Sequence, residues 1–493
     1  MKSIYARARE TGIVIATMVV AVVVGSSISR LSPTIALIVA LTAVALLSLV
    51  ALRRATRSAR DSRDDIETGE VWQEPDVVRL GRWFFYAGAV TTGFLIIRPV
   101  AGFTISDIFF GIGLILVAGH SIANGRPLLA PFPVPIMIGL VIFLVGASLS
   151  SFASPTPVQS LFVSAKFAYL FLGWSWLSRE VLHGSRHVEI ATRLWLISAA
   201  VCASAGILQI TAGVVIPGAQ NYYGRVSGLT GHVNDLGGVC AMALVVAVAS
   251  GFSQPSAKWR AIYLLLTTCI AAGLVFSGSV GSMAAAAAGI TIWLVTADRL
   301  GPITLRIGLV VIAATFIWSV LPLQSIAIKS PLYRLNEVTG RVGESASLND
   351  RTDNYALAWN AIAANPLVGH GLDSVGRLTP DGDPVHNLYL GSFYEAGVFG
   401  LVGIVVIIVS LSIWFVINIR SSAIDQRRVF LQLFASFVAF MVFSLSAPTL
   451  YQRYGWTPVI LFAAASGYQR LATARRTASQ PVEETGTRAA VSI

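Results

Sequence analysis

Long, uninterrupted apolar runs recur along most of this chain. Several reach about 20 residues, the length that carries a helix across the hydrocarbon core of a bilayer. The runs are continuous and do not alternate between polar and apolar positions, so they predict helices and not the strands of a membrane barrel. They fall at 12–29, 34–52, 83–97, 103–119, 134–152, 158–177, 190–212, 233–252, 261–277, 280–297, 307–323, 387–418, 429–447 and 456–469. The pattern predicts an all-α polytopic membrane protein with about 12 to 14 transmembrane helices.

Composition supports a lipid environment and limits the classes of function. Hydrophobic residues make up 55% of the 493 residues, and charged residues make up only 12%. A soluble domain carries about twice that share of charge. The net charge of +11 does not indicate nucleic-acid binding, because arginine and lysine gather in short loops and tails. Such loops face the cytoplasm in membrane proteins, and an N-terminus inside the cell places nearly every basic cluster on that side.

This orientation predicts a multi-pass protein of the cytoplasmic (inner) membrane with both termini in the cytoplasm. The runs at 83–97 and 103–119 are short, so a re-entrant pair stays open beside two full spans. The chain then divides into N-terminal spans (1–52), a charged cytoplasmic loop (53–82), a membrane domain (83–323), a large outer loop (324–386), C-terminal spans (387–470) and a disordered cytoplasmic tail (471–493).

The shorter of the two long outer loops, 213–232, contains an arginine among glycines. This residue is Arg225, and Asn234 follows it at the start of the next span. Glycines let the backbone approach a ligand closely, so the loop favours a binding role for Arg225. The alternative is an arginine that only reaches from the helix end to the membrane interface.

The larger outer loop, 324–386, contains a predicted amphipathic helix. Aromatic and apolar positions recur at helical spacing over 353–365, and a proline follows them. Such a helix lies on the bilayer surface or caps the bundle. Arg351 stands just ahead of the predicted helix, where its guanidinium and the free N–H groups of the helix N-terminus would suit a phosphate. The alternative for Arg351 is an ion pair with Asp350 or Asp353.

Polar residues also mark the junction of this loop with the next span. His386 and Asn387 end the loop, and Glu395 lies nine residues beyond His386 in an apolar run. On a continuous helix, nine residues cover about 13.5 Å and end on the opposite face, so His386 and Glu395 should not form a dyad. Histidine is suited to act as a base near neutral pH, although it can also only bond the backbone at a helix start. An intramembrane carboxylate is costly, so Glu395 either orients a cation or is a hydrogen-bonded structural group.

Four segments between residues 220 and 400 combine glycines, polar residues and the starts of spans. In chain order they read RVSGLTGHVNDLGG, FSGSVGSMAAAAAG, NDRTDNYALAWNAIAANPLVGHG and HNLYLGSFYEAG. Each is a weak signal alone, but their order and placement at the membrane are specific together. In this order the segments resemble the O-antigen ligase and Wzy-type polymerase superfamily of bacterial envelope proteins.

The resemblance implies a fold similar to the many-helix GT-C-like membrane glycosyltransferases and an activity that needs neither metal nor cofactor. It implies that a glycan is transferred or polymerised from an undecaprenyl-diphosphate-type carrier on the outer face of the membrane, with a glycan or lipid as acceptor. By the same resemblance, Arg225 and Arg351 hold the diphosphate, and His386 is the base or orients the acceptor. Supporting roles fall to Asn234, Asn387 and Glu395.

One position departs from the pattern of the family. The second segment commonly reads Ser-Arg-Gly in the family, whereas this chain has Ser279, Val280 and Gly281. Either Arg225 and Arg351 contribute more to phosphate binding here, or this branch has a different donor or activity.

Other functions stay open beside ligation. The nearest is polymerisation of the glycan, and a more distant one is transport of anions or glycan lipids. A transporter would need polar groups through several helices, whereas Asp107 and Lys166 are among the few charges in the runs. These two side chains pair with each other or mark an ion path. Asp381 and Asp383 form a D-x-D pattern that holds a metal ion in other glycosyltransferases, but the neighbouring prolines favour a plain turn.

Overall fold

The structure is a computed structural model that describes residues 74–99, 102–126, 128–219, 224–297, 346–374, 378 and 384–479. Within these residues every regular element is a helix. The elements are α3 (Asp76–Thr91), α4 (Ile105–Ala123), α5 (Val134–Ala153), α6 (Pro157–Ala168), the π-helix η2 (Tyr169–Gly173), α7 (Trp174–Val181), α8 (Ser185–Thr211), the 3₁₀ turn η3 (Gly228–Thr230), α9 (Val233–Ser253), α10 (Ala257–Ser277), α11 (Val280–Thr296), α14 (Ala346–Ala364), α15 (Leu388–Ser421), α16 (Ile424–Phe443) and α17 (Arg453–Ser479).

The helices confirm the predicted class, an all-α polytopic membrane protein. In the described part of the chain, eight helical segments are long and apolar enough to cross a membrane. One of them is the continuous segment Pro157–Val181, in which η2 links α6 to α7. The predicted runs at 12–29, 34–52 and 307–323 lie outside the described residues, and the division of the chain into six segments stays a prediction.

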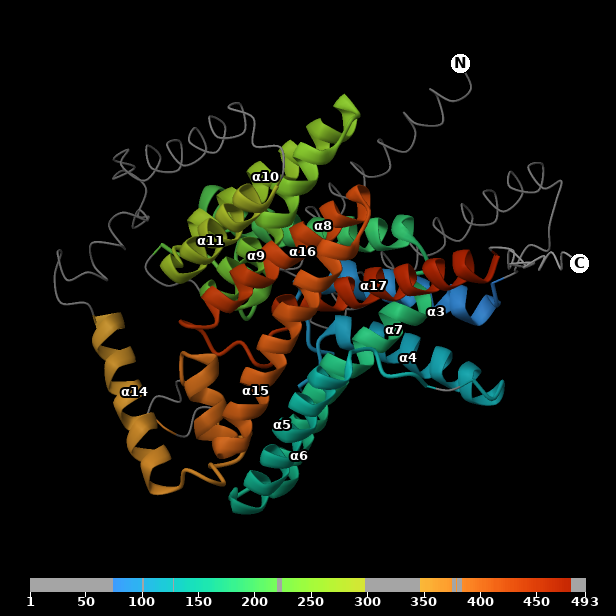
Figure 1. The fold of residues 1–493 in the computed structure, drawn as a ribbon. Helices are drawn as coiled ribbons and strands as arrows, with labels where there is room; N and C mark the ends of the chain where they lie inside the picture. The colour runs from blue at the N-terminus through green and yellow to red at the C-terminus, as the bar shows by residue number, and fades with distance from the viewer. Residues whose placement is uncertain are drawn as a thin grey trace, which may run out of the picture.

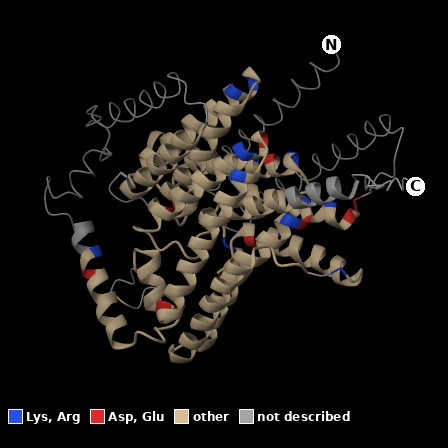
Figure 2. Ribbon diagram, in the orientation of Figure 1, with Lys and Arg blue, Asp and Glu red and all other residues tan. Residues whose placement is uncertain are grey.

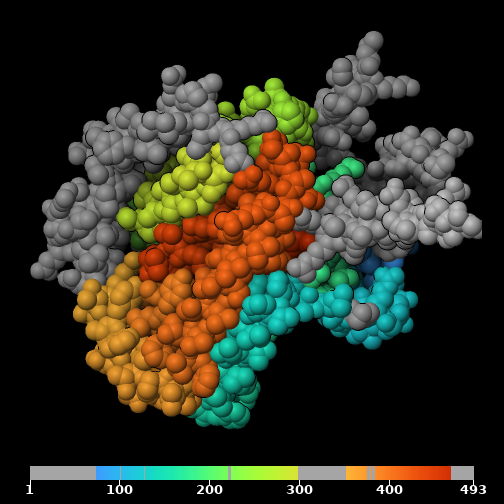
Figure 3. Space-filling view, in the orientation of Figure 1, coloured from blue at the N-terminus to red at the C-terminus, as the bar shows by residue number. Residues whose placement is uncertain are grey.

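Within the described residues, turns join successive helices, except α6 and α7, which η2 links into one continuous segment (Figure 1). We call the end at which α3, α8 and α10 finish and α9, α11 and α15 begin the loop end. Its loops bond one another: the Ile96 N–H donates to the Leu229 carbonyl at 3.1 Å, and the Leu388 N–H donates to the Ser444 carbonyl at 2.8 Å. Figure 3 shows α14 and α15 beside the α5–α6 hairpin.

Among the described residues, most of the Lys and Arg lie at the opposite end of the bundle. Figure 2 shows blue segments gathering near the start of α10 and along the neighbouring helix ends, with few on α14 and the start of α15. The basic residues at this end include Arg179, Arg186, Arg193, Lys258, Arg260, Arg420, Arg427 and Arg428. We call it the basic end, and its charge is the asymmetry that the loop composition predicts.

Helix α9 forms the centre of one half of the bundle. It packs against α8, α10, α11, α16 and α17, and 78% of its most apolar stretch is buried inside the protein. Glycines make this close packing possible, because a Cβ at Gly237 would lie 2.6 Å from Ser282 Oγ and one at Gly238 would lie 2.6 Å from the Tyr454 ring. Small residues at helix contacts are typical of membrane bundles.

Helix α15 is broken near its start, at a point beyond both His386 and Glu395. Gly397 has non-helical dihedral angles, with φ of 64°. The break frees backbone groups, which a segment of the large loop satisfies. The N–H groups of His370 and Gly371 donate to the carbonyls of Tyr394 (3.0 Å) and Glu395 (2.9 Å). The loop therefore docks into the bundle at this kink.

Replacing Gly397 by alanine should strongly destabilise the protein. A Cβ there would lie 2.2 Å from the Leu367 carbonyl oxygen, and the positive φ alone costs about 1–3 kcal/mol for a residue other than glycine. We expect a lower melting temperature of the detergent-solubilised protein, measured by tryptophan fluorescence. Gly119→Ala is the matched control, because a Cβ at Gly119 meets nothing within 4 Å. An unchanged melting temperature for Gly397→Ala would show that the kink is not required.

A polar network fixes the start of α3 at the basic end. Arg82, a buried residue, forms an ion pair with Glu74, and His183 Nδ1 lies 3.4 Å from Glu74 Oε1. Burial raises the pKa of Glu74, but hydrogen bonds from His183 and Arg82 and the charge of Arg82 outweigh burial and lower this pKa from 4.5 to about 2. The ionised carboxylate is therefore the form that stabilises the fold.

The stabilisation by Glu74 should depend on pH. Because the pKa of Glu74 is lower in the folded state, its contribution is complete above pH 4.5 and is lost as the pH falls toward about 2. We expect Glu74→Gln to lower the melting temperature at pH 7, and the difference from the wild type to shrink between pH 5 and pH 3. A difference that stays constant over this range would exclude the ion pair as its cause.

Candidate functional site

The structure brings Arg225 and Asn234 together at the loop end. Arg225 Nε donates to the Ser277 carbonyl oxygen (2.8 Å), and Nη2 donates to Asn234 Oδ1 (2.8 Å). The next residue, Gly278, has φ of 60°, and a Cβ there would lie 3.0 Å from Arg225 Cγ. The arginine therefore packs against the turn between α10 and α11, with its orientation fixed by two acceptors.

The sequence predicted that Arg351 lies just ahead of a helix, but the structure places Arg351 inside that helix. Helix α14 begins at Ala346, so Arg351 lies in its second turn. The prediction was wrong because the first residues of α14 are polar, and the apolar periodicity becomes visible only after Arg351. The free N–H groups of the helix start lie about a turn earlier in the chain, so Arg351 and these groups do not form the combined phosphate site that we expected.

Helix α14 is bonded to the segment that carries His386. The Asn354 side chain donates from Nδ2 to the Pro384 carbonyl (3.2 Å), and the Tyr355 hydroxyl donates to the His386 carbonyl (2.8 Å). Arg351 is one turn before Tyr355 and on the same face of the helix. Burial raises the pKa of the Tyr355 hydroxyl, and the nearby charge of Arg351 opposes this shift. Arg351 and His386 are therefore brought to the same region.

His386 is half-buried, and a backbone carbonyl orients its ring. Nδ1 lies 2.7 Å from the Pro384 carbonyl oxygen. A carbonyl can only accept a hydrogen bond, so Nδ1 carries the hydrogen and Nε2 is the acceptor of the neutral ring. This tautomer is the one that a general base needs, because Nε2 can take a proton while Nδ1 remains bonded.

Asn387 is the N-cap of α15. Its Oδ1 accepts hydrogen bonds from the N–H groups of Tyr389 (2.9 Å) and Leu390 (3.0 Å), which would otherwise be unsatisfied at the helix start. Its Nδ2 donates to the Leu445 carbonyl (3.2 Å). Asn387 thus fixes the backbone directly after His386.

Glu395 is buried at 9% exposure and has a tyrosine as its partner. The Tyr451 hydroxyl lies 3.3 Å from Glu395 Oε2. Within the described residues, no arginine bonds this carboxylate. Glu395 therefore connects the first part of α15 to the segment between α16 and α17.

The segment 444–446 lies between the two groups of predicted site residues. Arg225 and Asn234 form one group at the α10–α11 turn, and Arg351 and His386 form the other at the start of α15. Ser444 accepts from the Leu388 N–H, and a Cβ at Gly281, in the first turn of α11, would lie 2.3 Å from Ser446 Oγ. The two groups thus lie at the same end of the bundle, on either side of this segment.

Residues 263–405 match the sequence model of the family described as O-antigen ligase. The chain carries an O-antigen ligase domain. The match confirms the superfamily that the four segments indicated. No curated protein matches the chain.

The O-antigen ligase domain covers α10, α11, α14 and the first part of α15. It therefore includes Arg351, His386 and Glu395, whereas Arg225 and Asn234 come from the preceding loop and α9. Val280, where the family pattern led us to expect an arginine, is the first residue of α11. Arg225, from outside the matched residues, packs on the turn two residues before Val280, so a guanidinium still lies at this turn.

An arginine that sequence reasoning did not single out lies near the domain. Arg453, at the start of α17, donates to both carboxylate oxygens of Asp107, with distances of 2.6 to 3.0 Å. Its signal was its place in the short loop at 448–455, which the predicted orientation puts on the outer side together with Arg225 and Arg351. The bidentate pair joins residues 346 positions apart, so no local pattern could predict it.

The two charged residues noted in the early spans have different partners. Asp107 accepts from the Thr104 N–H (2.7 Å) and pairs with Arg453, so its interactions fix the start of α4. Among the described residues, no ion pair joins Asp107 to Lys166. Lys166 Nζ instead lies 6.0 Å from the centre of the Phe103 ring.

The described residues contain no group of three or more His, Cys, Asp or Glu side chains that could hold a metal ion. Asp381 and Asp383, the D-x-D pattern, lie outside the described residues.

Proposed function

We propose that the chain is an O-antigen ligase-like glycosyltransferase of the cytoplasmic membrane, which takes a glycan from an undecaprenyl-diphosphate-type carrier at the outer face. The observation that carries the proposal is the link between Arg351 and His386 through Tyr355, inside the O-antigen ligase domain. The link places a cation suited to phosphate and a base suited to a hydroxyl at one helix junction.

The reaction gives each group one role. The acceptor hydroxyl attacks the anomeric carbon of the donor glycan, the bond from this carbon to the diphosphate oxygen breaks, and its electron pair leaves with the diphosphate. The hydroxyl proton passes to His386 Nε2, while Arg225 and Arg351 stabilise the developing negative charge. The donor arrives already activated, so the step as written needs no nucleotide, metal or cofactor.

Three neighbours position these groups. Asn234 orients the Arg225 guanidinium through its Oδ1, and Asn387 caps α15 directly after His386. Glu395 accepts from Tyr451 and bonds the large loop through its carbonyl, so its role is to hold the kinked helix in place. Replacing any one of these three residues would shift the groups that it positions, while Arg225, Arg351 and His386 would remain present.

The orientation in the membrane follows from the charge of the two ends. The basic end matches the cytoplasmic side by the positive-inside rule, so we infer that the loop end faces outward. The cytoplasmic position of the two termini stays a prediction, because both chain ends lie outside the described residues. The large loop and the proposed site then meet a lipid-linked donor in the outer leaflet of the inner membrane.

Two other functions differ in what they require. A Wzy-type polymerase would use the same donor and the same base, and would differ in taking a second lipid-linked glycan as acceptor. A transporter of anions or glycan lipids would need polar groups along the spans, whereas the described charges Asp107, Lys166, Glu395 and Arg453 gather toward the loop end. This placement favours transfer over transport.

Depletion of the protein in its own cells tests the proposal. A ligase predicts loss of surface-attached glycan while full-length carrier-linked polymer accumulates. A polymerase predicts loss of long chains while single carrier-linked repeats accumulate. Unchanged glycan length and attachment after depletion would refute both, and a defect in solute uptake in their place would support the transporter.

A further inference from the structure

Lys166 is a cation within a candidate membrane span, and no carboxylate of the described residues forms an ion pair with it. It lies half-buried in the last turn of α6, directly before the π-helix η2. Within the described part of the chain, no ion pair or hydrogen bond of its ammonium group is found, and Nζ lies 6.0 Å from the centre of the Phe103 ring. A charged side chain inside a membrane span is energetically costly, and such residues commonly mark a substrate path. Short π-helical turns are also frequent at functional sites.

The carboxylate closest to Lys166 already has partners. Asp107 lines a small cavity together with Lys166, Leu170, Tyr451 and Arg453, and it binds Arg453 through both oxygens. Arg98 and Arg453 also lie within electrostatic reach of Lys166, and both are within reach of Asp235, so three cations face two carboxylates, Asp107 and Asp235. The excess of positive charge favours an anionic ligand.

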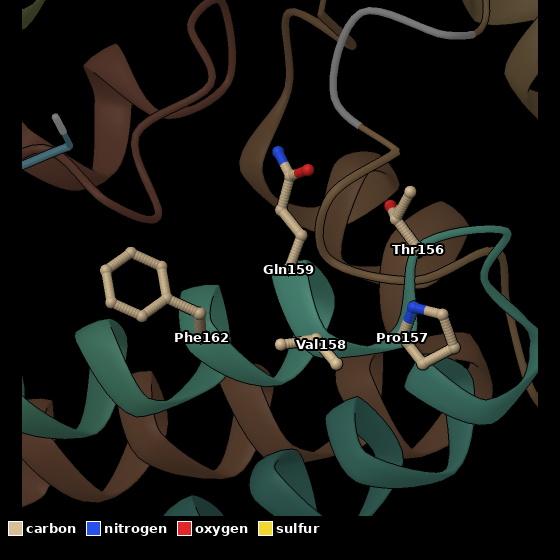
Figure 4. Close-up of a pocket in the computed structure, with 5 residues that line it drawn as sticks. All are labelled: Thr156, Pro157, Val158, Gln159 and Phe162. Atoms are coloured by element: carbon tan, nitrogen blue, oxygen red, sulfur yellow. The ribbon is translucent and has the colours of Figure 1, made fainter.

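An open apolar groove lies along the start of α6, and its last lining residue, Phe162, is one turn before Lys166. It has a volume of about 470 Å³ and is lined by Thr156, Pro157, Val158, Gln159 and Phe162. Figure 4 shows Gln159 and Phe162 projecting from α6 into open space. Val158 is 82% exposed and Phe162 is 45% exposed, which in a membrane protein means contact with lipid.

Aromatic contacts connect the groove to Lys166. The rings of Phe162 and Phe103 meet edge to face, with centres 5.6 Å apart, and Phe103 is the ring beneath Lys166 Nζ. A Cβ at Gly102 would lie 3.7 Å from Phe162 and 3.8 Å from Lys166 Nζ. The outline of the molecule is also notched between the α5–α6 hairpin and α4 (Figure 3). An apolar chain in the groove would therefore end at the cations.

We propose that Lys166 binds the diphosphate of the lipid-linked donor, whose hydrocarbon tail lies in the groove along Val158 and Phe162. This inference rests on the proposed function and adds a cation that the family pattern did not indicate. The combination of an apolar groove with a surplus of cations fits a ligand that joins a long tail to a multiply charged head. A free anion would leave the groove without a role.

The position of Lys166 relative to Arg225 fits a shared ligand. Lys166 and Asp235 both lie within electrostatic reach of Arg98 at the loop end, and Asp235 follows Asn234, the partner of Arg225.

Binding of undecaprenyl diphosphate to the purified full-length protein tests this inference. Native mass spectrometry in detergent would compare the wild type with Lys166→Gln, Lys166→Arg and the matched control Lys258→Gln at the basic end. Loss of one charge-assisted contact should weaken binding about tenfold in Lys166→Gln, while Lys166→Arg stays close to the wild type and Lys258→Gln is unchanged. Phe162→Ser should weaken undecaprenyl diphosphate binding but not that of inorganic pyrophosphate.

Three results would overturn the inference. One is wild-type affinity in Lys166→Gln, and another is equally tight binding of phosphatidylglycerol, which would make this a general site for anionic lipids. The third is an equal loss of affinity in Lys166→Gln and Lys166→Arg, which would indicate a structural effect. If Lys166→Gln binds normally while His386→Ala abolishes glycan transfer, only this inference fails. If the wild type binds no undecaprenyl diphosphate, the proposed function fails with it.

Discussion

Replacement of His386 by alanine is expected to lower the rate of glycan transfer by about 10²- to 10⁴-fold, the usual contribution of a general base. The physical reason is the hydrogen bond from Nδ1 to the Pro384 carbonyl, which leaves Nε2 as the proton acceptor. Alanine removes the acceptor but keeps the backbone carbonyl that binds Tyr355. The measurement is the initial rate of product formation by purified protein with a lipid-linked donor.

The control for this prediction is His120→Ala, at the far end of α4 from the loop end. It should transfer glycan at the wild-type rate. Donor binding to His386→Ala should also stay near the wild-type value, because the base acts on the acceptor and not on the diphosphate. Transfer by His386→Ala within about threefold of the wild type, an effect too small for a general base, would remove His386 from the mechanism.

Replacement of Arg225 by alanine is expected to lower the transfer rate by about 10²- to 10³-fold, the range seen when one preorganised donor to a developing charge is lost. Its guanidinium donates to the Ser277 carbonyl and to Asn234 at the same time. Lysine has no planar fork with which to hold these two acceptors and still face a phosphate, so Arg225→Lys should recover little activity.

Asn234→Ala separates the effect of the orientation of Arg225 from the effect of its charge. It removes one of the two acceptors that hold Arg225 and leaves the guanidinium in place, so we expect a smaller loss than in Arg225→Ala. Arg126→Ala changes an exposed arginine at the basic end and should have no effect on the rate. Wild-type rates in Arg225→Ala, with the protein monodisperse in detergent, would exclude a role for this arginine in diphosphate binding.

The membrane architecture was predictable because its signal is local. Each apolar run is long enough to predict a helix without information from the rest of the chain. The described helices α8, α9 and α10 closely follow the runs at 190–212, 233–252 and 261–277. The order of polar segments at the starts of spans was also visible, and it led to the correct superfamily. These features depend on neighbouring residues and not on contacts across the bundle.

The interactions that position the site were not predictable in the same way. The break of α15 depends on Gly397 and on a loop that supplies backbone donors from about 25 residues earlier. The Asp107–Arg453 pair joins distant helices, and the early start of α14 has no apolar period to reveal it. Tertiary contacts decide these features, so a pattern read along the chain cannot contain them.

The kink and the docked loop also explain how a site can form between separate parts of the chain. Asp373, in the docked loop, accepts hydrogen bonds from Ser154 (2.7 Å) and Thr156 at the tip of the α5–α6 hairpin. The same loop bonds the carbonyls of Tyr394 and Glu395. The large loop thus joins the hairpin that carries Lys166 to the helix that follows His386.

Glycan transfer by the purified protein in proteoliposomes tests the proposed activity most directly. The vesicles would contain an undecaprenyl-diphosphate-linked glycan and the lipid and glycan acceptors extracted from the source cells, with a chelator present. We expect the wild type to transfer glycan over time and to release undecaprenyl diphosphate. We expect this transfer to be lost in His386→Ala and Arg225→Ala. Absence of transfer by the folded wild type, or equal transfer by all three proteins, would contradict the proposed activity.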